Sequence, residues 1–372
     1  MTTVLHVLDR AVEPAALERL RLLAARGEGA GLRQAYAALD GATRVRAAAA
    51  LGAEVALTPA RLGLAFMASE RIRVLARRAG AQCVHAWGAA ALTACGAAAR
   101  ERPLAVTPAR YEELAGVCRC ARQVWPMPAV VVGCQAWRRR CVEQGVALER
   151  TAVIRAAVDF AALNAARGAG ARASLARGGG PVVLAAGPAS RRDGQFTVLW
   201  AVAIVQQIHR GMRLIVPFGG SEARRLGRLA ESVGLSEMLG LPGERHSWAA
   251  LAAGADVLML APDEEAAPEP LAWGMAAGLG IVAPARRSIS ECIADRSNGL
   301  LLRDARPTPL AAALLRLVED EPLRKRLGET ARGQAYEVFS ARACVEGCAR
   351  MYENLAAGRA VGDGVSDTAM VA

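Results

Sequence analysis

Glu265-Ala-Ala-Pro-Glu-Pro-Leu-Ala-Trp273-Gly-Met275-Ala-Ala-Gly278 is the stretch that decides the fold of this chain. A short apolar run, 257–260, ends just before it, and a second apolar run, 280–283, begins just after its final glycine. Between the runs, the pattern predicts a turn over 262–268 and then a helix that begins near Pro270. A strand, a helix and a further strand in this order are typical of a parallel sheet with crossover helices.

The beginning of this helix has the character of an anion site. The first backbone amides of a helix have no partner within it, and the helix dipole places positive charge at the same end. Pro268 and Pro270 carry no amide hydrogen, so the remaining donors are the amides of Ala266, Ala267 and Glu269. The stretch therefore predicts binding of a negatively charged group such as a diphosphate.

The same alternation of short apolar runs and longer helical segments continues along the whole chain. The predicted strands are 4–8, 83–85, 104–107, 129–132, 152–154, 182–185, 214–217, 257–260 and 280–283. The predicted helices are 15–25, 68–79, 89–100, 136–144, 196–208, 222–233, 248–253, 270–277, 323–338 and 341–355. We interpret the pattern as an α/β protein with two Rossmann-like, doubly wound parallel-sheet domains that face a cleft.

One stretch interrupts this alternation. Residues 164–180 are Gly-rich and lack periodic apolar positions, which predicts a linker. The expected N-terminal domain is then 1–163 and the C-terminal domain 181–340. We expect a helix at 341–355 to return to the first domain, and the Gly/Ala/Ser-rich tail 356–372 to be disordered.

Composition narrows the class of protein. The chain has 372 residues, of which 53% are hydrophobic and 22% charged, as in a globular protein long enough for two domains. The net charge of +11 favours anionic partners such as nucleotide diphosphates and phospholipid headgroups. The arginines are scattered singly and in short runs, so the charge disfavours nucleic acid as a partner. Peripheral contact with an anionic membrane remains open.

The sequence also gives expectations about metal binding and about the cellular location of the protein. None of the nine cysteines has zinc-ligand spacing, and we expect small buried thiols in a reducing cytoplasm. The N-terminal run 2–8 has no basic region or cleavage site, so we expect a first strand and not a signal peptide. The longest apolar stretch, 248–262, is too short to span a bilayer. We expect a cytoplasmic protein, with any membrane contact at the inner face.

Several stretches together resemble the retaining GT-B glycosyltransferases of the family-four type. The family's donor-site pattern, Glu-Gly-x-Pro/Gly-x-x-x-x-Glu-Ala-Met-Ala-x-Gly-x-Pro-Val-Val-Ala, aligns with the quoted stretch without a gap. Further segments follow the family in order, at 82–88, 131–134, 145–160, 295–302 and 320–328. The resemblance covers roughly residues 80–355 and implies the GT-B fold, with two Rossmann-like domains.

The resemblance also implies roles for individual residues. Glu265 takes the position of the glutamate that contacts the donor sugar. Arg191 and Arg192 lie in the loop where the family has two cations on the diphosphate. His85 matches the first histidine of the family's His-x-His, near the reacting centre. Gly219 and His246 fall in loops around the nucleotide base.

Four positions depart from the family pattern. Trp273 stands where a second glutamate binds the ribose hydroxyls; tryptophan stacks on sugars or bases, or fills space at a helix–sheet contact. Pro188 and Asp193 stand where the family has the Arg and the Lys of its diphosphate loop. Trp87 replaces the second histidine. Glu13-Pro14 further replaces a glycine pair expected after the first strand.

Three candidate residues, Arg191, Arg192 and His85, have a second interpretation. Arg191 and Arg192 either replace the missing cations or are solvated loop arginines. A lone histidine at the end of a strand, such as His85, is often only a hydrogen-bonded structural residue.

The function that the resemblance implies is transfer of a hexose from a nucleotide-diphosphate sugar to a sugar or lipid-linked acceptor. Such enzymes need no metal or other cofactor, and the chain has no Asp-x-Asp metal motif. The alternative is a catalytically inactive relative that serves as a binding or scaffold protein.

Overall fold

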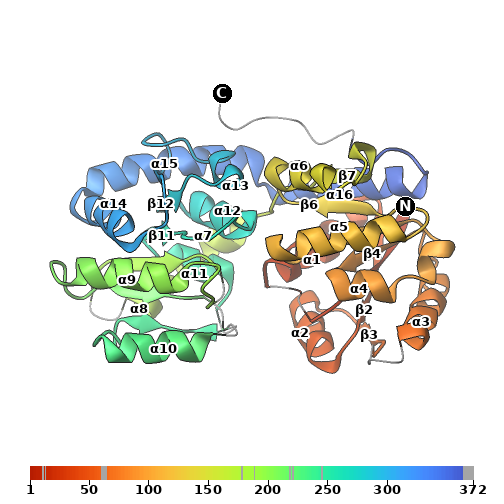
Figure 1. Cartoon of the computed structure of the whole chain (residues 1–372), viewed down its shortest axis with the longest axis horizontal. Helices are drawn as coiled ribbons and strands as arrows, with labels where there is room; N and C mark the ends of the chain where they lie inside the picture. The colour runs from red at the N-terminus through yellow and green to blue at the C-terminus, as the bar shows by residue number, and fades with distance from the viewer. Residues whose placement is uncertain are drawn as a thin grey trace. The chain divides into compact units, whose positions relative to one another are not determined.

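The computed structural model describes residues 1–10, 12, 14–59, 65–176, 179–187, 189–217, 219, 222–243 and 246–362. The chain forms two compact units (Figure 1). Among the described residues, unit 1 comprises Met1–Ala157 and Ala341–Gly362, and unit 2 comprises Val158–Ser340.

Unit 1 is built on a parallel sheet of seven strands in the order β3-β2-β1-β4-β5-β6-β7. Its strands are β1 (Thr2–Leu8), β2 (Leu32–Ala38), β3 (Val55–Leu57), β4 (Cys83–Trp87), β5 (Leu104–Thr107), β6 (Ala129–Val132) and β7 (Thr151–Val153). Its helices are α1 (Pro14–Arg26), α2 (Gly41–Leu51), α3 (Ala65–Arg78), α4 (Ala89–Ala94), α5 (Leu114–Gln123), α6 (Gln135–Glu143) and α16 (Ala341–Ala356). Short 3-10 helices are η1 (Glu28–Ala30), η2 (Ala98–Arg100), η3 (Tyr111–Glu113) and η4 (Leu148–Arg150).

Unit 2 is built on a parallel sheet of six strands in the order β10-β9-β8-β11-β12-β13. Its strands are β8 (Val182–Ala185), β9 (Arg213–Ile215), β10 (Leu239–Gly240), β11 (Val257–Met259), β12 (Gly280–Pro284) and β13 (Leu300–Leu302). Its helices are α7 (Phe160–Gly168), α8 (Ala171–Leu175), α9 (Gln195–Gln206), α10 (Ala223–Ser232), α11 (Trp248–Gly254), α12 (Pro268–Ala277), α13 (Arg287–Ser290), α14 (Pro307–Glu319) and α15 (Glu321–Val338).

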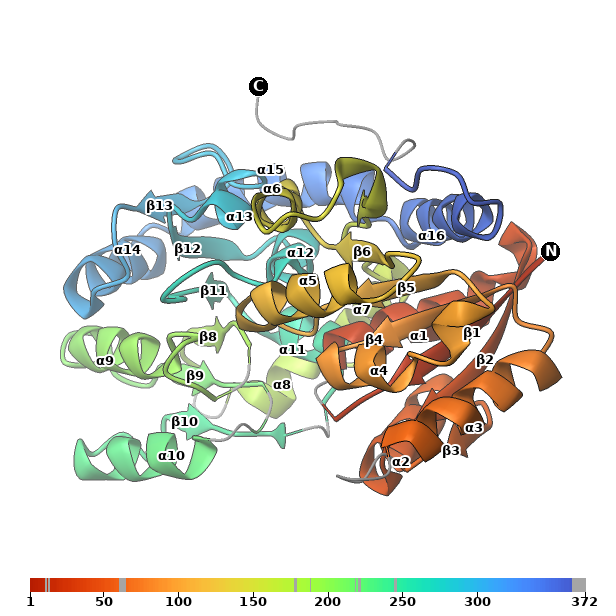
Figure 2. The same ribbon diagram turned by 45° about the vertical axis from the view of Figure 1, so that its right-hand side comes forward.

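Both sheets have the strand order of a Rossmann fold, so the predicted pair of doubly wound domains is confirmed. In each sheet the order reverses between two central strands, β1 and β4 in unit 1 and β8 and β11 in unit 2. Ligands of such sheets bind beyond the carboxyl ends of the strands at this reversal. Figure 2 shows the strands of unit 2 from a second direction.

Several predicted boundaries differ from the structure. The units divide at Ala157, and the expected linker 164–180 lies inside unit 2, where it contains the end of α7 and all of α8. Two features explain this: Asp159 caps α7 by accepting a hydrogen bond from the Ala162 amide, and Leu163 and Leu175 are buried.

The chain after α16 also departs from the expectation of disorder. Val361 is buried, and its amide donates to the Glu149 carbonyl oxygen at 3.0 Å. The tail 356–372 is therefore ordered on unit 1 as far as residue 362, and the rest of it lies outside the described residues. No helix in the described part of the chain is both long and apolar enough to cross a membrane.

Candidate functional site

The candidate site lies in unit 2, where the strand order reverses between β8 and β11. Two loops follow these strands, 186–194 before α9 and 260–267 before α12. The Ala186 amide donates to the Met259 carbonyl oxygen at 3.0 Å, and the Asp263 amide donates to the Arg192 carbonyl oxygen at 2.9 Å. These bonds hold the two loops against each other, so candidate residues from both loops are brought together.

Gly194 allows this close approach. Its φ is 84°, and a Cβ atom there would lie 1.9 Å from the Ala261 carbonyl oxygen. Any other residue would meet both a strained backbone and the opposite loop. Gly194 therefore fixes how α9 begins beside the end of β11.

Glu265 is held by a short helix that follows β12. Its Oε2 accepts a hydrogen bond from the Ser288 amide at 2.8 Å, and the Ser288 Oγ accepts one from the Ala266 amide at 3.1 Å. One Glu265 oxygen is thereby engaged, and the half-buried carboxylate is fixed at the carboxyl edge of the sheet. The prediction that the Ala266 amide is free for an anion is wrong, because Ser288 already uses it.

The beginning of α12 is a weaker anion site than the sequence predicted. The helix starts at Pro268, because proline is tolerated in the first turn. Glu269 lies in this turn, where its negative charge opposes that of a phosphate, and it is already engaged in a polar contact. The Ala267 amide has no hydrogen-bond partner among the described residues and remains the clearest donor.

Arg191 is partly committed to a carboxylate. Its amide donates to Glu222 Oε2 at 2.8 Å, and its Nε lies 3.6 Å from Glu222 Oε1. Its guanidinium also lies over the Phe196 ring, 4.3 Å from the ring centroid. Arg191 and Arg192 are both exposed. Glu222 was not anticipated from the sequence, and it competes with any anion for Arg191.

Asp193 has a structural role within the same loop. The Ser190 Oγ donates to Asp193 Oδ2 at 2.7 Å and accepts from the Asp193 amide at 3.1 Å. This reciprocal pair closes the turn before α9. Pro188, which stands at the family's arginine position, lies outside the described residues, as does Glu13 in unit 1.

Gln195 is a further residue that sequence reasoning missed. It begins α9, is fully buried and donates from Nε2 to the Ala186 carbonyl oxygen. Its Oε1 is buried and has no partner in the described part of the chain. A lone glutamine after a glycine carries no recognisable pattern, so the sequence offered no signal for it.

Trp273 is 2% exposed within α12. A side chain at this depth has almost no surface for a ribose or a base. The interpretation as a space-filling residue therefore agrees with its burial, and its assignment to donor contact does not.

Gly219 and His246 lie in the sequence between the two loops of the site. Gly219 is exposed after β9, and His246 is half-buried before α11. The Nδ1 atom of His246 is buried without a partner among the described residues. Residues next to both lie outside the described ranges, so their role at a nucleotide base stays a prediction.

His85 is buried in the interior of unit 1, and its role near the reacting centre stays a prediction. Its Nδ1 lies 2.6 Å from the Tyr352 hydroxyl and its Nε2 lies 2.8 Å from the Thr107 Oγ1. Burial, followed by the nearby His6 and Arg19, holds the pKa of His85 well below its ordinary value. A neutral histidine with both nitrogens engaged has none left for a substrate.

Trp87, at the family's second histidine position, is buried beside His85. Its indole nitrogen donates to His6 Nδ1 at 3.1 Å, and its ring stacks on His85 at 4.6 Å between centroids. The two positions of the family's His-x-His are thus held here by two buried residues, His85 and Trp87, which pack in the core of unit 1.

Metal ligands do not assemble in the described ranges. No group of three or more His, Cys, Asp or Glu residues there has the geometry to hold a metal ion. The backbone amides and arginines of the site suit the anionic part of an organic ligand.

Comparison with known protein families gives a match within unit 2. Residues 170–334 match the model of the family described as glycosyl transferases group 1. The match lies within unit 2 and includes both loops of the site described above.

Relatives and solved structures agree with that assignment. A segment of 82 residues is 35% identical to the uncharacterized glycosyltransferase MJ1178 of Methanocaldococcus jannaschii, which covers 22% of this chain and 23% of that protein. The match thus spans about a quarter of the relative's length.

Solved structures extend the likeness to the whole fold. The structure of Anabaena Alr3699/HepE in complex with UDP-glucose superposes with a TM-score of 0.80 at 18% identity, covering 96% of this chain and 100% of that one. WaaG, a glycosyltransferase involved in lipopolysaccharide biosynthesis, gives a TM-score of 0.73 at 16% identity, covering 94% and 99%. The fold of both units is therefore GT-B.

Proposed function

We propose that this protein transfers a hexose from a nucleotide-diphosphate sugar to a sugar or lipid-linked acceptor. The observation that carries the proposal is the placement of Glu265. Its carboxylate is fixed by Ser288 at the carboxyl edge of a group 1 domain, beside the strand reversal where such sheets bind ligands. One Glu265 oxygen stays available to accept hydrogen bonds from sugar hydroxyl groups.

The diphosphate of the donor would be bound by protein groups alone. The Ala267 amide at the start of α12 and the guanidinium groups of Arg191 and Arg192 are the donors that this site offers. Their role is to stabilise the negative charge that builds up on the leaving diphosphate. Retention at the sugar carbon and independence from metal ions are part of the proposal.

The solved structures with the same fold suggest the first ligands to test. HepE was solved with UDP-glucose and with UDP, and WaaG acts in lipopolysaccharide biosynthesis. A uridine nucleotide sugar and a lipid-linked saccharide are therefore the first donor and acceptor to try.

The proposal is tested by calorimetric titration of the protein with UDP and UDP-glucose. Replacing Arg191 and Arg192 together with Ala should weaken binding by about 1.5–3 kcal/mol, the value of one charge-assisted hydrogen bond. Glu222→Gln should strengthen binding, because it releases Arg191 from its carboxylate partner. Arg210→Ala, after the far end of α9, is the control and should leave affinity unchanged.

Two outcomes would contradict the proposal. The first is a wild-type protein that binds no nucleotide diphosphate from a panel of uridine, guanosine and adenosine sugars. The second is equal affinity in the double arginine variant and the wild type, which would make both residues ordinary surface arginines.

A second candidate function is nucleotide-sugar binding without transfer. The buried Trp273 and the acidic Glu269 in the first turn of α12 favour it, because both weaken the contacts expected for a donor. Product analysis by mass spectrometry separates the two: donor binding without a transferred sugar, over a panel of acceptors, identifies a binding protein. Turnover at ordinary rates, about 1–1,000 per second, would exclude it.

A further inference from the structure

Helix α9 has an unusual sequence for a helix at the surface. No charged residue occurs from Gln195 to Ile208. A helix that is mostly apolar and carries no charged face is normally covered by other parts of the protein. Yet Trp200 is 43% exposed, Ile204 43% and Ile208 64%.

These three side chains form one continuous row. They are four residues apart, and neighbours at this spacing lie on the same face of a helix. The amides of Ile208 and His209 both donate to the Val205 carbonyl oxygen, so the chain keeps its helical turn just beyond α9. We call Trp200, Ile204 and Ile208 the α9 apolar row.

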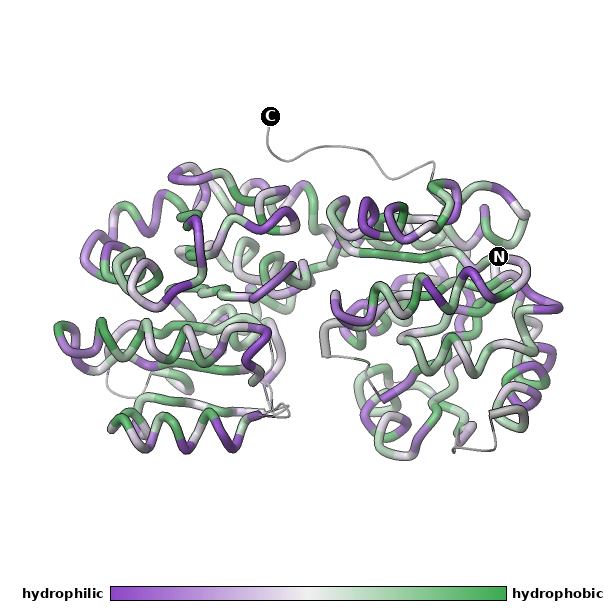
Figure 3. Tube along the Cα trace, viewed as in Figure 1, coloured by the Kyte–Doolittle hydropathy of each residue, from purple (hydrophilic) through white to green (hydrophobic). Residues whose placement is uncertain are grey.

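Uncompensated positive charge adjoins the α9 apolar row. In Figures 1 and 2, α9 lies next to α10 on one side and α14 on the other, in agreement with their packing contacts. Figure 3 shows α9 as largely apolar, whereas α10 alternates between apolar and hydrophilic residues. The exposed Arg210, Arg224 and Arg228 form no ion pair with any described residue.

The other charges nearby leave this positive excess in place. Arg225 pairs with Glu222 at 3.4 Å, and His209 lies 3.1 Å from Glu319. Glu231, near the end of α10, is exposed and is the one further carboxylate that α10 contributes.

We propose that the α9 apolar row, with Arg210, Arg224 and Arg228, is a docking surface for an anionic lipid bilayer. The isoleucines enter the boundary between headgroups and acyl chains, where tryptophan is also favourable. The arginines contact the lipid phosphates. A second copy of the chain fits less well, because a symmetric pairing through this surface brings like-charged arginines together.

This surface is independent of sugar transfer. The row runs along α9 away from Gly194, which begins the helix at the candidate site. Vesicle binding therefore tests the docking surface whether or not the proposed glycosyl transfer is correct.

The experiment is flotation of the full-length protein with vesicles of phosphatidylcholine alone or of phosphatidylcholine with roughly one third anionic phosphatidylglycerol. We expect binding to the anionic vesicles that falls as salt is raised. Ile204→Glu with Ile208→Glu should abolish binding. Arg224→Gln with Arg228→Gln should weaken it about fivefold for each arginine removed.

Matched controls lie on unit 1. Trp125→Glu changes another exposed tryptophan, which is 87% exposed, and Arg71→Gln with Arg78→Gln removes two exposed arginines of α3. Both should leave binding unchanged, and all variants should unfold at the wild-type temperature because the altered side chains are exposed.

Three results would overturn the proposal. One is a wild type that does not float with anionic vesicles. Another is an equal loss of flotation in the unit 1 controls, which would indicate binding by overall charge. The third is a wild-type dimer in light scattering that becomes monomeric with the isoleucine pair replaced, without vesicle binding, which would assign the row to a second copy.

Discussion

Among single residues, a row of polar aromatic side chains crosses the sheet of unit 1. Tyr36, His6 and His85 lie side by side on β2, β1 and β4, in register. Tyr352 of α16 contacts both histidines. Burial lowers the pKa of His6 to about 3 and that of His85 well below its ordinary value, so both are neutral in the folded protein.

These histidines should make the protein sensitive to acid. Their pKa is lower in the folded chain than in the unfolded chain, so the unfolded chain binds more protons below about pH 6.5. Stability should therefore fall as pH decreases from 6.5, by about 1.4 kcal/mol per pH unit for each histidine. His6→Gln should reduce this slope by about half.

Thermal unfolding between pH 4.5 and 8 measures the effect. His209→Gln is the control, because that histidine is on the surface beside Glu319. An identical acid slope in His6→Gln and the wild type would show that His6 is not held neutral by the fold.

Two glycines offer a matched pair of substitutions in unit 2. Gly194→Ala should destabilise the protein by more than about 2 kcal/mol, because it combines a positive φ with a clash against the Ala261 backbone. Gly227→Ala, in the middle of α10 with open space around it, should stabilise it by about 0.5–1 kcal/mol. Urea unfolding of both variants checks the opposite signs, and equal effects would contradict the close approach of the two loops.

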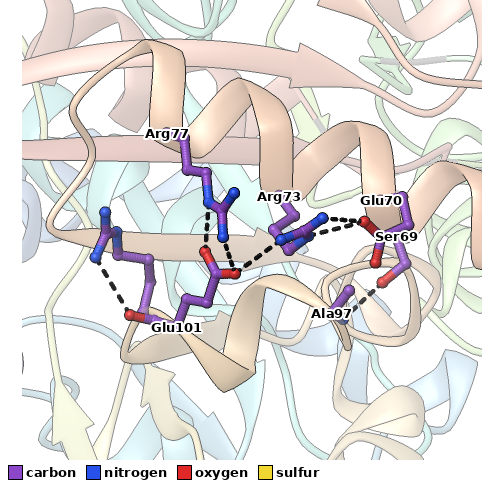
Figure 4. A network of polar contacts seen from close by, with 7 residues as sticks. Ser69, Glu70, Arg73, Arg77, Ala97 and Glu101 are labelled. Atoms are coloured by element: carbon purple, nitrogen blue, oxygen red, sulfur yellow. Dashed lines mark hydrogen bonds and ion pairs between the residues drawn. The ribbon is translucent and has the colours of Figure 1, made fainter.

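Among the secondary-structure elements, α3 is tied to η2 by a network of charged groups (Figure 4). Arg73 Nη1 donates to Glu101 Oε1 at 2.9 Å, and Arg77 Nε donates to Glu101 Oε2 at 2.8 Å. Arg73 also bonds Glu70 at 2.8 Å, and the Ala97 amide donates to the Ser69 Oγ. The hydrogen bonds from Arg77 and then Arg73 lower the pKa of Glu101 to about 2.

Glu101→Gln should lower the unfolding temperature slightly at pH 7 and low salt. Because the folded pKa of Glu101 is below its unfolded value, its contribution is present above about pH 4.5 and is lost as pH falls towards 2. The network is at the surface, so added salt should also remove the difference between variant and wild type. A difference that is independent of salt would indicate a packing defect instead.

Apolar periodicity predicted most of the strands and many of the helices, but strands β2, β3, β10 and β13 and helices α2 and α5 were missed. Strand β2 was missed because Arg33 and Gln34 interrupt its apolar run and alanines, which are weak strand formers, make up much of the rest. Within the site, Glu265 was found from its family position. Ser288, Glu222 and Gln195 were missed because they reach the site through tertiary folding, from positions with no local pattern.

At the scale of the whole molecule, the chain passes from unit 1 to unit 2 and back. The return is made at Ala341, where α16 begins. This helix buries side chains in the core that covers one face of the unit 1 sheet, namely Ala341, Cys344, Val345, Cys348, Met351, Tyr352 and Leu355. The stability of unit 1 therefore depends on a segment that follows unit 2 in the sequence.

Unit 2 consists of one continuous segment, so we expect 158–340 to fold alone, whereas a chain that ends at residue 340 should lose the fold of unit 1. In the full chain, Met351→Ala should destabilise unit 1, and Leu327→Ala, fully buried in α15, should destabilise unit 2. Each should cost about 2–5 kcal/mol, the usual effect of removing a large apolar side chain from a core. Calorimetry of the full chain and of 158–340 assigns the transitions. If both substitutions shift a single shared transition, the two units unfold together and the expected independence of unit 2 is wrong.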